Sequence, residues 1–321
     1  MNNKPLLTIA IPTYNRCEYL KRLLISIIPQ VESYSNEIEV IVCDNASTDD
    51  TKNTACALLK NITNSQYYRN ESNVGMDGNF LRCRQLANGE FFWMIGDDDF
   101  VLPDGISAVI DVLKENPSLN LVYVNSTVEN VAQIKNSPAE YMNSAEQFVS
   151  RIGIMITFIS GIISRNDNTH FKNDNDVSQK IMGMFLMHLS WQFLALKNGN
   201  SFAIINNNII KATPDNSGGY RIFSVFAQNL SQILDLFFAR DGHISKKIRR
   251  SSMFFLLNFI GRPEKQKNHK KESPIAACDA AFDDLPIYKY VTRYAYKYPF
   301  IAGCYCEFKD VAKKVLKLAR R

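Results

Sequence analysis

The stretch FFWMIGDDDF, residues 91–100, decides the fold, because an apolar run passes directly into Gly96 and three consecutive aspartates. A short apolar run that ends in polar residues is typical of a buried strand. The predicted strand, residues 91–95, therefore delivers Asp97, Asp98 and Asp99 at its carboxyl end. The rest of the fold follows from the segments around it.

Similar apolar runs lie upstream, and segments with helical periodicity separate them. The predicted strands are residues 6–11, 38–42 and 67–68, and the predicted helices are residues 15–28, a segment that ends near Leu59, and residues 80–87. Asn15 stands three residues before Glu18, the capping-box spacing that opens a helix, and Pro29 predicts the end of that helix. Four strands with helices between them predict an α/β fold with a mostly parallel sheet flanked by helices.

Polar residues follow three of these strands. They are TYNR at residues 13–16, Asp44 with Asn45, and the aspartate run at residues 97–99. Ligands of such sheets bind beyond the carboxyl ends of the strands. We therefore expect the three motifs to form one site.

The aspartate run predicts a metal site. Like carboxylates at close range raise one another's pKa, and a divalent cation relieves that repulsion. Mg²⁺ and Mn²⁺ prefer carboxylate oxygens and commonly bridge to substrate phosphates, so the cation would stabilise a departing diphosphate. The alternative is a solvated acidic turn before a helix near residues 102–104.

Other residues near these motifs are weaker candidates. Tyr14 could stack beneath a base, and Asp44 with Asn45 could bind a base or a ribose. The pair could also form a plain helix-cap turn. Arg82 and Arg84 could offset phosphate charge, or they could be surface arginines.

Taken in order, four motifs resemble those of family 2 glycosyltransferases, which have the GT-A fold. The motifs are IPTYNR at residues 11–16, DNASTD at 44–49, NVG at 73–75, and GDDD at 96–99 with Pro103. The resemblance covers about residues 5–125. The GDDD form, with Trp93 upstream, is most similar to transferases that add dideoxyhexoses such as abequose to O-antigen repeat units.

The resemblance implies an enzyme that moves a sugar from a nucleotide-sugar donor to a glycan acceptor, with a lipid-linked surface polysaccharide unit expected. It implies nucleotide-binding roles for Pro12, Thr13, Tyr14, Arg16, Asp44, Asn45, Gly75, Asp97 and Asp98. Asp44 would contact the base, Asp98 the ribose or the metal, and Asp99 would be the main ligand of Mg²⁺ or Mn²⁺. Many members carry an aspartate where Gly96 stands, so Asp97 would be an auxiliary ligand only.

The acceptor half departs from the family pattern. Residues 158–165 resemble the strand that forms the floor of the acceptor site. Family members usually then carry an acidic catalytic base, often Glu-Asp, on a helix about a dozen residues before a glycine. Counting back from Gly199 reaches Met187 and His188, where no acidic pair stands. Histidine can act as a general base near neutral pH, so His188 is the candidate catalytic base. The alternative is a packed core histidine in an apolar helix, residues 182–196. Asp215 and Asn216 could close over the donor.

Charge divides the chain of 321 residues. Residues 240–321 carry 19 Lys and Arg against 8 Asp and Glu, whereas residues 1–239 carry 18 against 24. We predict a glycosyltransferase domain over residues 1–239, with a nucleotide half (5–125) and an acceptor half (126–239). A basic helical region would follow over residues 240–321. Such a region suggests an anionic partner, unless its charges are merely solvated.

A membrane surface is the favoured partner of this region. Residues 288–300 mix tyrosines with lysines, and the last segment is amphipathic at helical spacing. Its apolar face would hold Phe308, Val311, Val315 and Leu318, and the rest would carry Lys309, Lys313, Lys314, Lys317, Arg320 and Arg321. We predict a cytoplasmic protein that binds peripherally to the inner face of the cytoplasmic membrane.

Several other classes fit the sequence less well. The polar residues 1–5 predict no secretory signal, residues 152–163 are too short to span a bilayer, and seven scattered cysteines fit a reducing compartment. A sugar nucleotidyltransferase would carry a glycine-rich phosphate loop where residues 12–15 read Pro-Thr-Tyr-Asn. No nucleic-acid module is recognised and the body is acidic, so we expect no nucleic-acid partner.

Overall fold

The computed structural model describes residues 4–128, 138–166, 175–213, 219–262 and 269–319. The chain forms two compact units, Met1–Pro214 and Asp215–Arg321. This division lies before the boundary that charge suggested at residue 239, because the helices around residues 224–237 pack within the second unit. Whether catalytic and membrane roles divide at either point stays a prediction.

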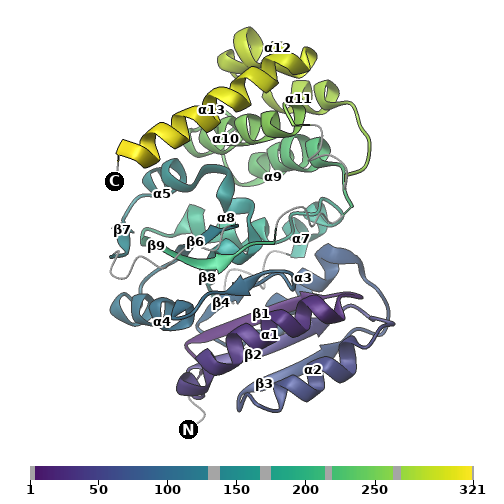
Figure 1. The fold of residues 1–321 in the computed structure, drawn as a ribbon, viewed down its shortest axis with the longest axis vertical. Coiled ribbons are helices and arrows are strands. Elements are labelled where there is room, and N and C mark those ends of the chain that lie inside the picture. Colours follow the sequence, from purple (N-terminus) through teal and green to yellow (C-terminus); the bar gives the residue numbers. More distant parts are fainter. Residues whose placement is uncertain (1–3, 129–137, 167–174, 214–218, 263–268, 320–321) are drawn as a thin grey trace. The chain divides into compact units, whose positions relative to one another are not determined.

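The first unit is built on one mixed sheet, in which the described residues form nine strands (Figure 1). The strand order is β3-β2-β1-β4-β8-β6-β9-β5, with β7 paired to β9. The strands are β1 (Leu7–Thr13), β2 (Ile38–Asp44), β3 (Ser65–Arg69), β4 (Phe91–Met94), β5 (Phe100–Val101), β6 (Leu121–Thr127), β7 (Glu140–Met142), β8 (Ile162–Arg165) and β9 (Phe202–Lys211). Strands β3, β2, β1 and β4 are parallel, which confirms the predicted α/β class.

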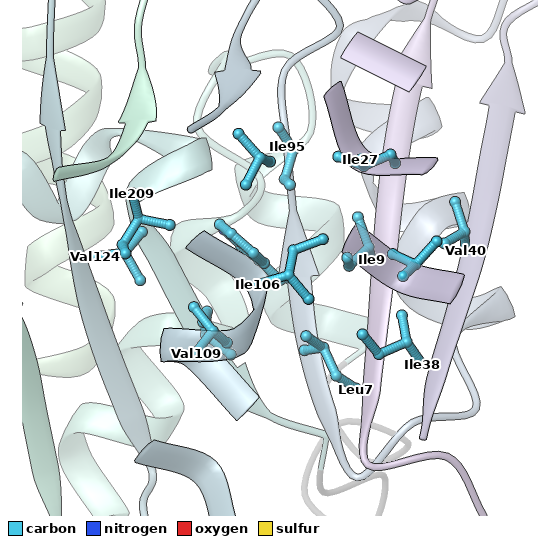
Figure 2. Close-up of a cluster of buried hydrophobic side chains, with 14 of the residues drawn as sticks. Leu7, Ile9, Ile27, Ile38, Val40, Ile95, Ile106, Val109, Val124 and Ile209 are labelled. Atoms are coloured by element: carbon cyan, nitrogen blue, oxygen red, sulfur yellow. The ribbon is translucent and has the colours of Figure 1, made fainter. Parts of the chain in front are cut away.

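Helices cover both faces of this sheet. They are α1 (Cys17–Val31), α2 (Thr51–Leu59), α3 (Gly75–Leu86), α4 (Gly105–Glu115), α5 (Ala145–Ile152), α7 (Asn175–Ile181) and α8 (Leu189–Asn198), with short 3-10 turns η1 (Glu32–Tyr34), η2 (Gly153–Thr157) and η3 (Ile159–Gly161). Alternate residues of β1 and β2, such as Ile9 and Val40, pack with Ile27 of α1 and Ile106 of α4 (Figure 2). The other face meets α3, which contacts β1 and β2.

Both predicted boundaries of the first helix were wrong. Helix α1 begins at Cys17 without a side-chain cap, because Asn15 adopts a left-handed conformation and its Oδ1 accepts the Thr48 N–H at 2.7 Å. Asn15 therefore tethers the neighbouring turn instead of capping the helix. Pro29 lies inside α1, which continues to Val31, because a proline near the end of a helix removes only one backbone hydrogen bond.

The acceptor-side predictions also needed correction. The predicted strand over residues 158–165 begins only at Ile162, after two 3-10 turns. The predicted helix over residues 182–196 begins only at Leu189. Gly183 and Phe185 have positive φ angles, which no helix contains, so residues 182–187 form a loop and His188 stands at the start of α8.

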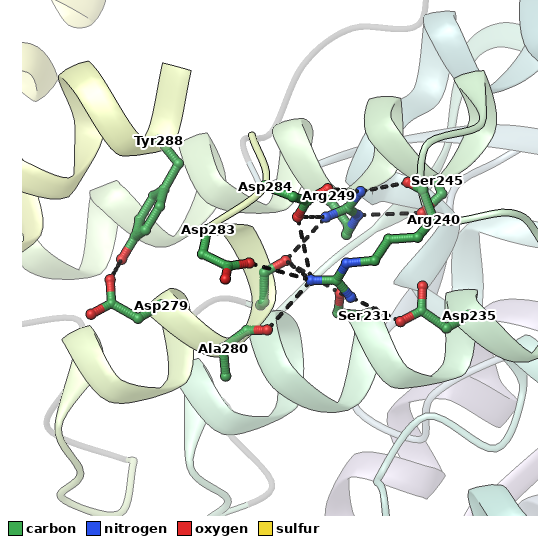
Figure 3. Close-up of polar contacts among 11 residues, drawn as sticks. Ser231, Asp235, Arg240, Ser245, Arg249, Asp279, Ala280, Asp283, Asp284 and Tyr288 are labelled. Atoms are coloured by element: carbon green, nitrogen blue, oxygen red, sulfur yellow. Dashed lines mark hydrogen bonds and ion pairs between the residues drawn. The ribbon is translucent and has the colours of Figure 1, made fainter. Parts of the chain in front are cut away.

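The second unit is helical. Its elements are the π-helical turns η4 (Ser224–Asn229) and η6 (Tyr288–Thr292) and the helices α9 (Leu230–Phe237), α10 (His243–Ile260), α11 (Pro274–Phe282), α12 (Arg293–Lys297) and α13 (Pro299–Ala319). Apolar side chains from η4, α10, α11, α12 and α13 form one core. Beside it, the fully buried Arg249 forms a bidentate ion pair with Asp284 (Figure 3).

No helix in the described ranges of either unit is both long and apolar enough to cross a membrane.

Candidate functional site

The ends of β1 and β4 are joined by the residues that the sequence singled out. Strand β1 lies between β2 and β4 in parallel register, so Thr13 ends beside the aspartate run. The Thr13 hydroxyl donates to Asp97 Oδ2 at 2.8 Å, and Arg16 Nη1 donates to Asp97 Oδ1 at 3.0 Å. Arg16 also lies 3.5 Å from Asp98 Oδ2. The predicted meeting of these two motifs at one sheet edge is therefore present.

Asp99 has a different set of partners. Its Oδ2 accepts the Ser160 hydroxyl at 2.6 Å, and its Oδ1 accepts the Thr213 N–H at 3.1 Å. The same Ser160 oxygen accepts the Gly96 N–H at 2.9 Å. Ser160 thus fixes the backbone and a side chain of the GDDD segment. Sequence reasoning missed this serine, because η3 brings it to the site from 61 residues away.

Burial changes the acidity of two of these aspartates. It raises the pKa of Asp97 to about 6, against the opposing effects of Arg16 and Thr13. Burial also raises the pKa of Asp99 to about 7, against the hydrogen bond from Ser160, and repulsion from Asp98 and Asp97 adds to the rise. The negative charge of the run is therefore only partly compensated by the protein's own groups.

The carboxylate oxygens of the aspartate run fit a divalent cation whose remaining ligands are substrate phosphates. Among the described residues, no three His, Cys, Asp or Glu side chains converge on one point that could hold a metal. Mg²⁺ and related ions are commonly held by one or two carboxylates, with substrate phosphates and waters completing the shell. The Asp98 side chain is 18% exposed against 6% for Asp97, so it is the more accessible carboxylate of that pair.

Asp44 is buried at the end of β2 and is held from two sides. Its Oδ1 accepts the Ser47 N–H at 2.8 Å, while its Oδ2 accepts Arg69 Nη1 at 2.8 Å and the Tyr67 hydroxyl at 2.5 Å. Sequence reasoning missed Arg69, although it lies directly opposite Asp44 in the parallel register of β2 and β3. Arg69 therefore supplies a positive charge at this corner of the site.

Asn45 joins the motif at residues 44–49 to the motif at residues 73–75. Its amide nitrogen donates to Asn73 Oδ1 at 2.8 Å and to the Gly75 carbonyl at 3.1 Å. Its amide oxygen accepts Asn70 Nδ2 and the Val74 N–H, both at 3.0 Å. Gly75 therefore lies beside Asn45, and an amide network fixes the turn before α3.

The remaining candidates lie in varied surroundings. Pro12 is buried within β1, and Tyr14 is 42% exposed beyond its end. Arg84 is buried with its guanidinium 5.4 Å from the Phe92 ring centroid, so it is not a surface arginine, whereas Arg82 is exposed. Asp215 and Asn216 lie outside the described residues.

His188 is buried at the start of α8. Its Nε2 lies 3.0 Å from the Thr157 carbonyl, and its ring meets Phe80 edge-on at 6.2 Å between centroids. Burial lowers its pKa to about 4. The other ring nitrogen, Nδ1, is buried and has no hydrogen-bond partner within the described part of the chain.

Comparisons with known proteins bear on the same half of the chain. Residues 8–172, about half of the chain, match the family model described as Glycosyl transferase family 2. The abequosyltransferase RfbV of Salmonella typhimurium is 31% identical over 178 residues, which are 50% of this chain and 53% of that protein. A GalNAc(5)-diNAcBac-PP-undecaprenol beta-1,3-glucosyltransferase of Campylobacter jejuni is 32% identical over 126 residues, 39% of each chain. The matches thus span about half the length of these curated relatives, or less.

A solved structure extends the likeness in fold. The crystal structure of S. aureus TarS 1-349 in complex with UDP-GlcNAc superposes with a TM-score of 0.62 at 18% identity. The alignment covers 92% of this chain and 87% of that one. At this identity the comparison carries the fold alone.

Proposed function

The chain belongs to glycosyl transferase family 2, and from that premise we propose that it transfers a sugar from a nucleotide-sugar donor to a glycan acceptor. One observation carries the proposal. Thr13, Asp44 and residues 97–99 lie at or just after the ends of neighbouring strands, along one sheet edge, and the carboxylates of Asp44, Asp97 and Asp99 are buried. A nucleotide, a diphosphate and a cation match the groups found there.

The nucleotide is placed along the ends of β1 and β2. Tyr14 offers an exposed ring on which a base can stack, and Arg69, which the buried Asp44 holds in place, offers hydrogen-bonding groups to the edge of the base. Pro12 and Thr13 line the pocket through their backbone. Asn45 and Gly75 shape its wall through the amide network.

The diphosphate is placed at the aspartate run, with Mg²⁺ or Mn²⁺ held by Asp98 and Asp99. When bound, the cation supplies positive charge to the leaving diphosphate. We place the main contact at Asp98, because Ser160 and Thr213 already hold both oxygens of Asp99. Asp97 is paired with Thr13 and Arg16, so its role is to position Arg16 beside the phosphates.

His188 is the proposed general base on the acceptor side. The Thr157 carbonyl can only accept a hydrogen bond, so it favours the tautomer with a proton on Nε2. The lone pair then lies on Nδ1, which has no partner among the described groups. A histidine with a pKa of about 4 is neutral at physiological pH, so Nδ1 keeps its lone pair for the proton of an acceptor hydroxyl, although the low pKa also makes it a weaker base than an ordinary histidine.

The acceptor is proposed to be a lipid-linked glycan unit of a surface polysaccharide. The support comes from the relatives: one is named for transfer of abequose and the other for an undecaprenol-linked substrate. A lipid-linked acceptor also makes a peripheral membrane site useful to the enzyme.

The second unit has an exposed aromatic and basic surface that we propose binds the membrane. Tyr290, Tyr294, Tyr298, Phe300, Phe308 and Val311 are all exposed, with Phe300 at 73% and Phe308 at 74%. Lysines accompany the rings: Lys289 lies 5.7 Å from the Tyr290 ring and Lys297 lies 5.4 Å from the Tyr298 ring. Aromatic rings beside cations suit an anionic lipid headgroup layer. Tyr288 and Tyr296, which the sequence assigned to this surface, are instead buried in the core.

Sedimentation with vesicles tests this membrane surface. Truncation after residue 286 would remove the core residues Tyr288 and Tyr296, so point substitutions are the sharper tool. Phe300→Ser with Phe308→Ser should reduce binding to phosphatidylglycerol vesicles at low salt. The control is Leu236→Ser, an exposed apolar residue on α9. Wild-type protein that stays in the supernatant at every lipid charge would contradict the membrane proposal.

A thermal-shift panel tests the enzymatic proposal itself. UDP, GDP, CDP and dTDP are each added with and without Mn²⁺, since a ligand of the folded state raises the melting temperature. One nucleotide should give the largest shift, and Mn²⁺ should increase it. If no nucleotide shifts the melting temperature under any condition, the proposed function is wrong.

A further inference from the structure

A buried carboxylate organises the loop over residues 182–187. The Asp77 side chain, in the first turn of α3, is 5% exposed and accepts three backbone N–H groups from this loop. Gly183 and Phe185 donate to Oδ2, each at 2.9 Å, and Met187 donates to Oδ1 at 3.1 Å. Alternate N–H groups of the loop thus converge on one anion, an arrangement that resembles the anion-binding nests of the protein backbone, and here the anion belongs to the protein itself. We call this arrangement the nest.

The nest requires an unusual backbone at two alternate residues. Gly183 has φ +87° and Phe185 has φ +64°, both in the left-handed region. Glycine adopts this conformation freely, whereas a bulky residue is strained there. A glycine at position 185 would form the same nest without strain. The phenylalanine is therefore there for its ring, which is 39% exposed.

The loop lies between the donor motif and the proposed base. Asp77 stands two residues after Gly75, whose carbonyl binds Asn45 at the end of β2. At its other end the loop runs into His188, which binds the Thr157 carbonyl, and Ser160 nearby in the chain holds Asp99. Strained residues of this kind cluster at ligand-binding sites.

We propose that Phe185 is a contact for a sugar ring of the acceptor, and that Asp77 is the positioning residue that fixes it there. This inference rests on the proposed function and assigns the acceptor side of the same site. The face of an aromatic ring carries negative charge density, which complements the weakly positive C–H face of a pyranose. Met182, also exposed in this loop, extends the apolar surface.

Substitution of Phe185 separates the ring from the backbone. Phe185→Gly removes the ring and relieves the strain, which offsets part of the packing lost with the ring, so the melting temperature should fall only slightly. The same variant should raise the apparent KM for acceptor by about tenfold or more, because a buried aromatic contact of this size is lost. Phe185→Tyr retains the ring and is the matched control, with a KM near that of wild type.

The assay uses the full chain with four radiolabelled donors: UDP-GlcNAc, UDP-glucose, GDP-mannose and a CDP-dideoxyhexose. Membranes from the native host, with the gene deleted, serve as acceptor and are titrated to obtain the apparent KM. Hydrolysis of the same donors without membranes reports the donor side, and it should be equal in all variants. If wild type and Phe185→Gly have the same KM for acceptor, the inference is wrong while the proposed function stands. If wild type neither transfers nor hydrolyses any donor, the proposed function itself fails.

Asp77→Asn tests the positioning role. An amide offers one acceptor oxygen in place of two, so the N–H groups of residues 183, 185 and 187 should exchange with deuterium faster than in wild type. Apparent KM for acceptor should rise, with donor hydrolysis unchanged. The double variant Asp77→Asn with Phe185→Gly should be no worse than Phe185→Gly alone, because Asp77 acts through the ring. Additive defects would show that Asp77 has a separate, merely structural role.

Discussion

The two units bury charge in opposite ways. In the second unit, burial works to raise the pKa of Asp284, but Arg249 and Arg240 lower it below its usual value (Figure 3). In the first unit, burial raises the pKa of Asp97 to about 6, and Arg16 opposes this rise only in part. Burial raises the pKa of Asp99 to about 7, against hydrogen bonds from Ser160 and Thr213. Both arrangements contain well-formed hydrogen bonds, so hydrogen bonding does not distinguish them.

The difference distinguishes charges that stabilise the fold, in the Arg249–Asp284 cluster, from charges that are available to a ligand, in the aspartate run. Arg249 donates to both oxygens of Asp284 and to the carbonyls of Arg240 and Ala281, so the cluster is complete without any other group. The aspartate run has a deficit of positive charge that a cation or a positively charged intermediate can fill. Uncompensated burial of titratable groups is a feature of functional sites.

The largest expected effect is the loss of transfer in Asp98→Asn. Removing the accessible carboxylate from the proposed cation site should lower the rate by on the order of a thousandfold, because stabilisation of the leaving diphosphate is lost. Asp284→Asn is the matched control, the same chemical change in the compensated cluster. It should lower stability and leave the activity of the folded enzyme unchanged. Transfer rates with Mn²⁺ measure both, and wild-type turnover by Asp98→Asn would remove the basis of the comparison.

The sequence predicted that the donor-side motifs lie along one sheet edge, for a physical reason. Parallel strands end at a common edge, so Thr13, Asp44 and Asp97 had to lie near one another once their strands were recognised. The residues that tune the site were not predicted. Ser160 and Thr213 reach Asp99 from 61 and 114 residues away, through turns that have no periodic pattern.

In the acceptor half, the local sequence pattern predicted the wrong secondary structure, because a distant contact determines the backbone there. Residues 182–196 have helical apolar spacing, but the carboxylate of Asp77 takes the N–H groups of residues 183, 185 and 187 and turns the chain out of the helix. A contact of 106 residues' separation overrides local preference, and no single-sequence signal marks it. The alternation of tyrosine and lysine in residues 288–300 likewise could not separate the buried Tyr288 and Tyr296 from the exposed Tyr290.

The next effect is the destabilisation of the second unit by Arg249→Met. Methionine fills much of the volume but leaves Asp284 without its bidentate partner and the Arg240 carbonyl without the Arg249 donor, while Arg240 and Ser231 still donate to the Ala281 carbonyl. Arg249 is fully buried whereas the Asp284 side chain is 34% exposed, so breaking the pair should lower the free energy of unfolding by about 3 kcal/mol, the low end of the range for buried pairs. Urea unfolding followed by far-ultraviolet circular dichroism, which reports the helices, measures it. Arg249→Lys should recover part of the loss, and an Arg249→Met protein as stable as wild type would show that the cluster contributes nothing.

His188 allows a test of the acceptor side of the first unit that does not change any of its carboxylates. As a base that takes the acceptor proton, it should contribute about a hundredfold to the rate, so His188→Ala should lower kcat by that factor. The shift of melting temperature by nucleotide should persist, because the donor side does not involve the imidazole. The opposite pattern, a stability loss with normal activity per folded molecule, would make His188 a packed core residue.

The smallest effect is a change in the pH dependence of stability, and it measures the uncompensated charge directly. Asp99 has a pKa of about 7 in the folded chain, above its ordinary value near 3.8. The folded state therefore binds more protons than the unfolded state between about pH 4 and pH 7, and stability from this group falls as pH rises through that window. Asp99→Asn cannot titrate and lacks this fall. The contribution of His188 has the opposite sign, since its folded pKa of about 4 is below its ordinary value, but His188 is common to both proteins and its contribution cancels in their difference.

With EDTA present, the stability of Asp99→Asn relative to wild type should rise by at least about 1 kcal/mol between pH 4 and pH 8. Urea unfolding followed by tryptophan fluorescence suits this test, because Trp93 and Trp191, the two tryptophans of the chain, both lie in the first unit. Parallel pH profiles for the two proteins would mean that Asp99 is ionised and compensated in the fold, as Asp284 is, and the distinction between the two clusters would be lost.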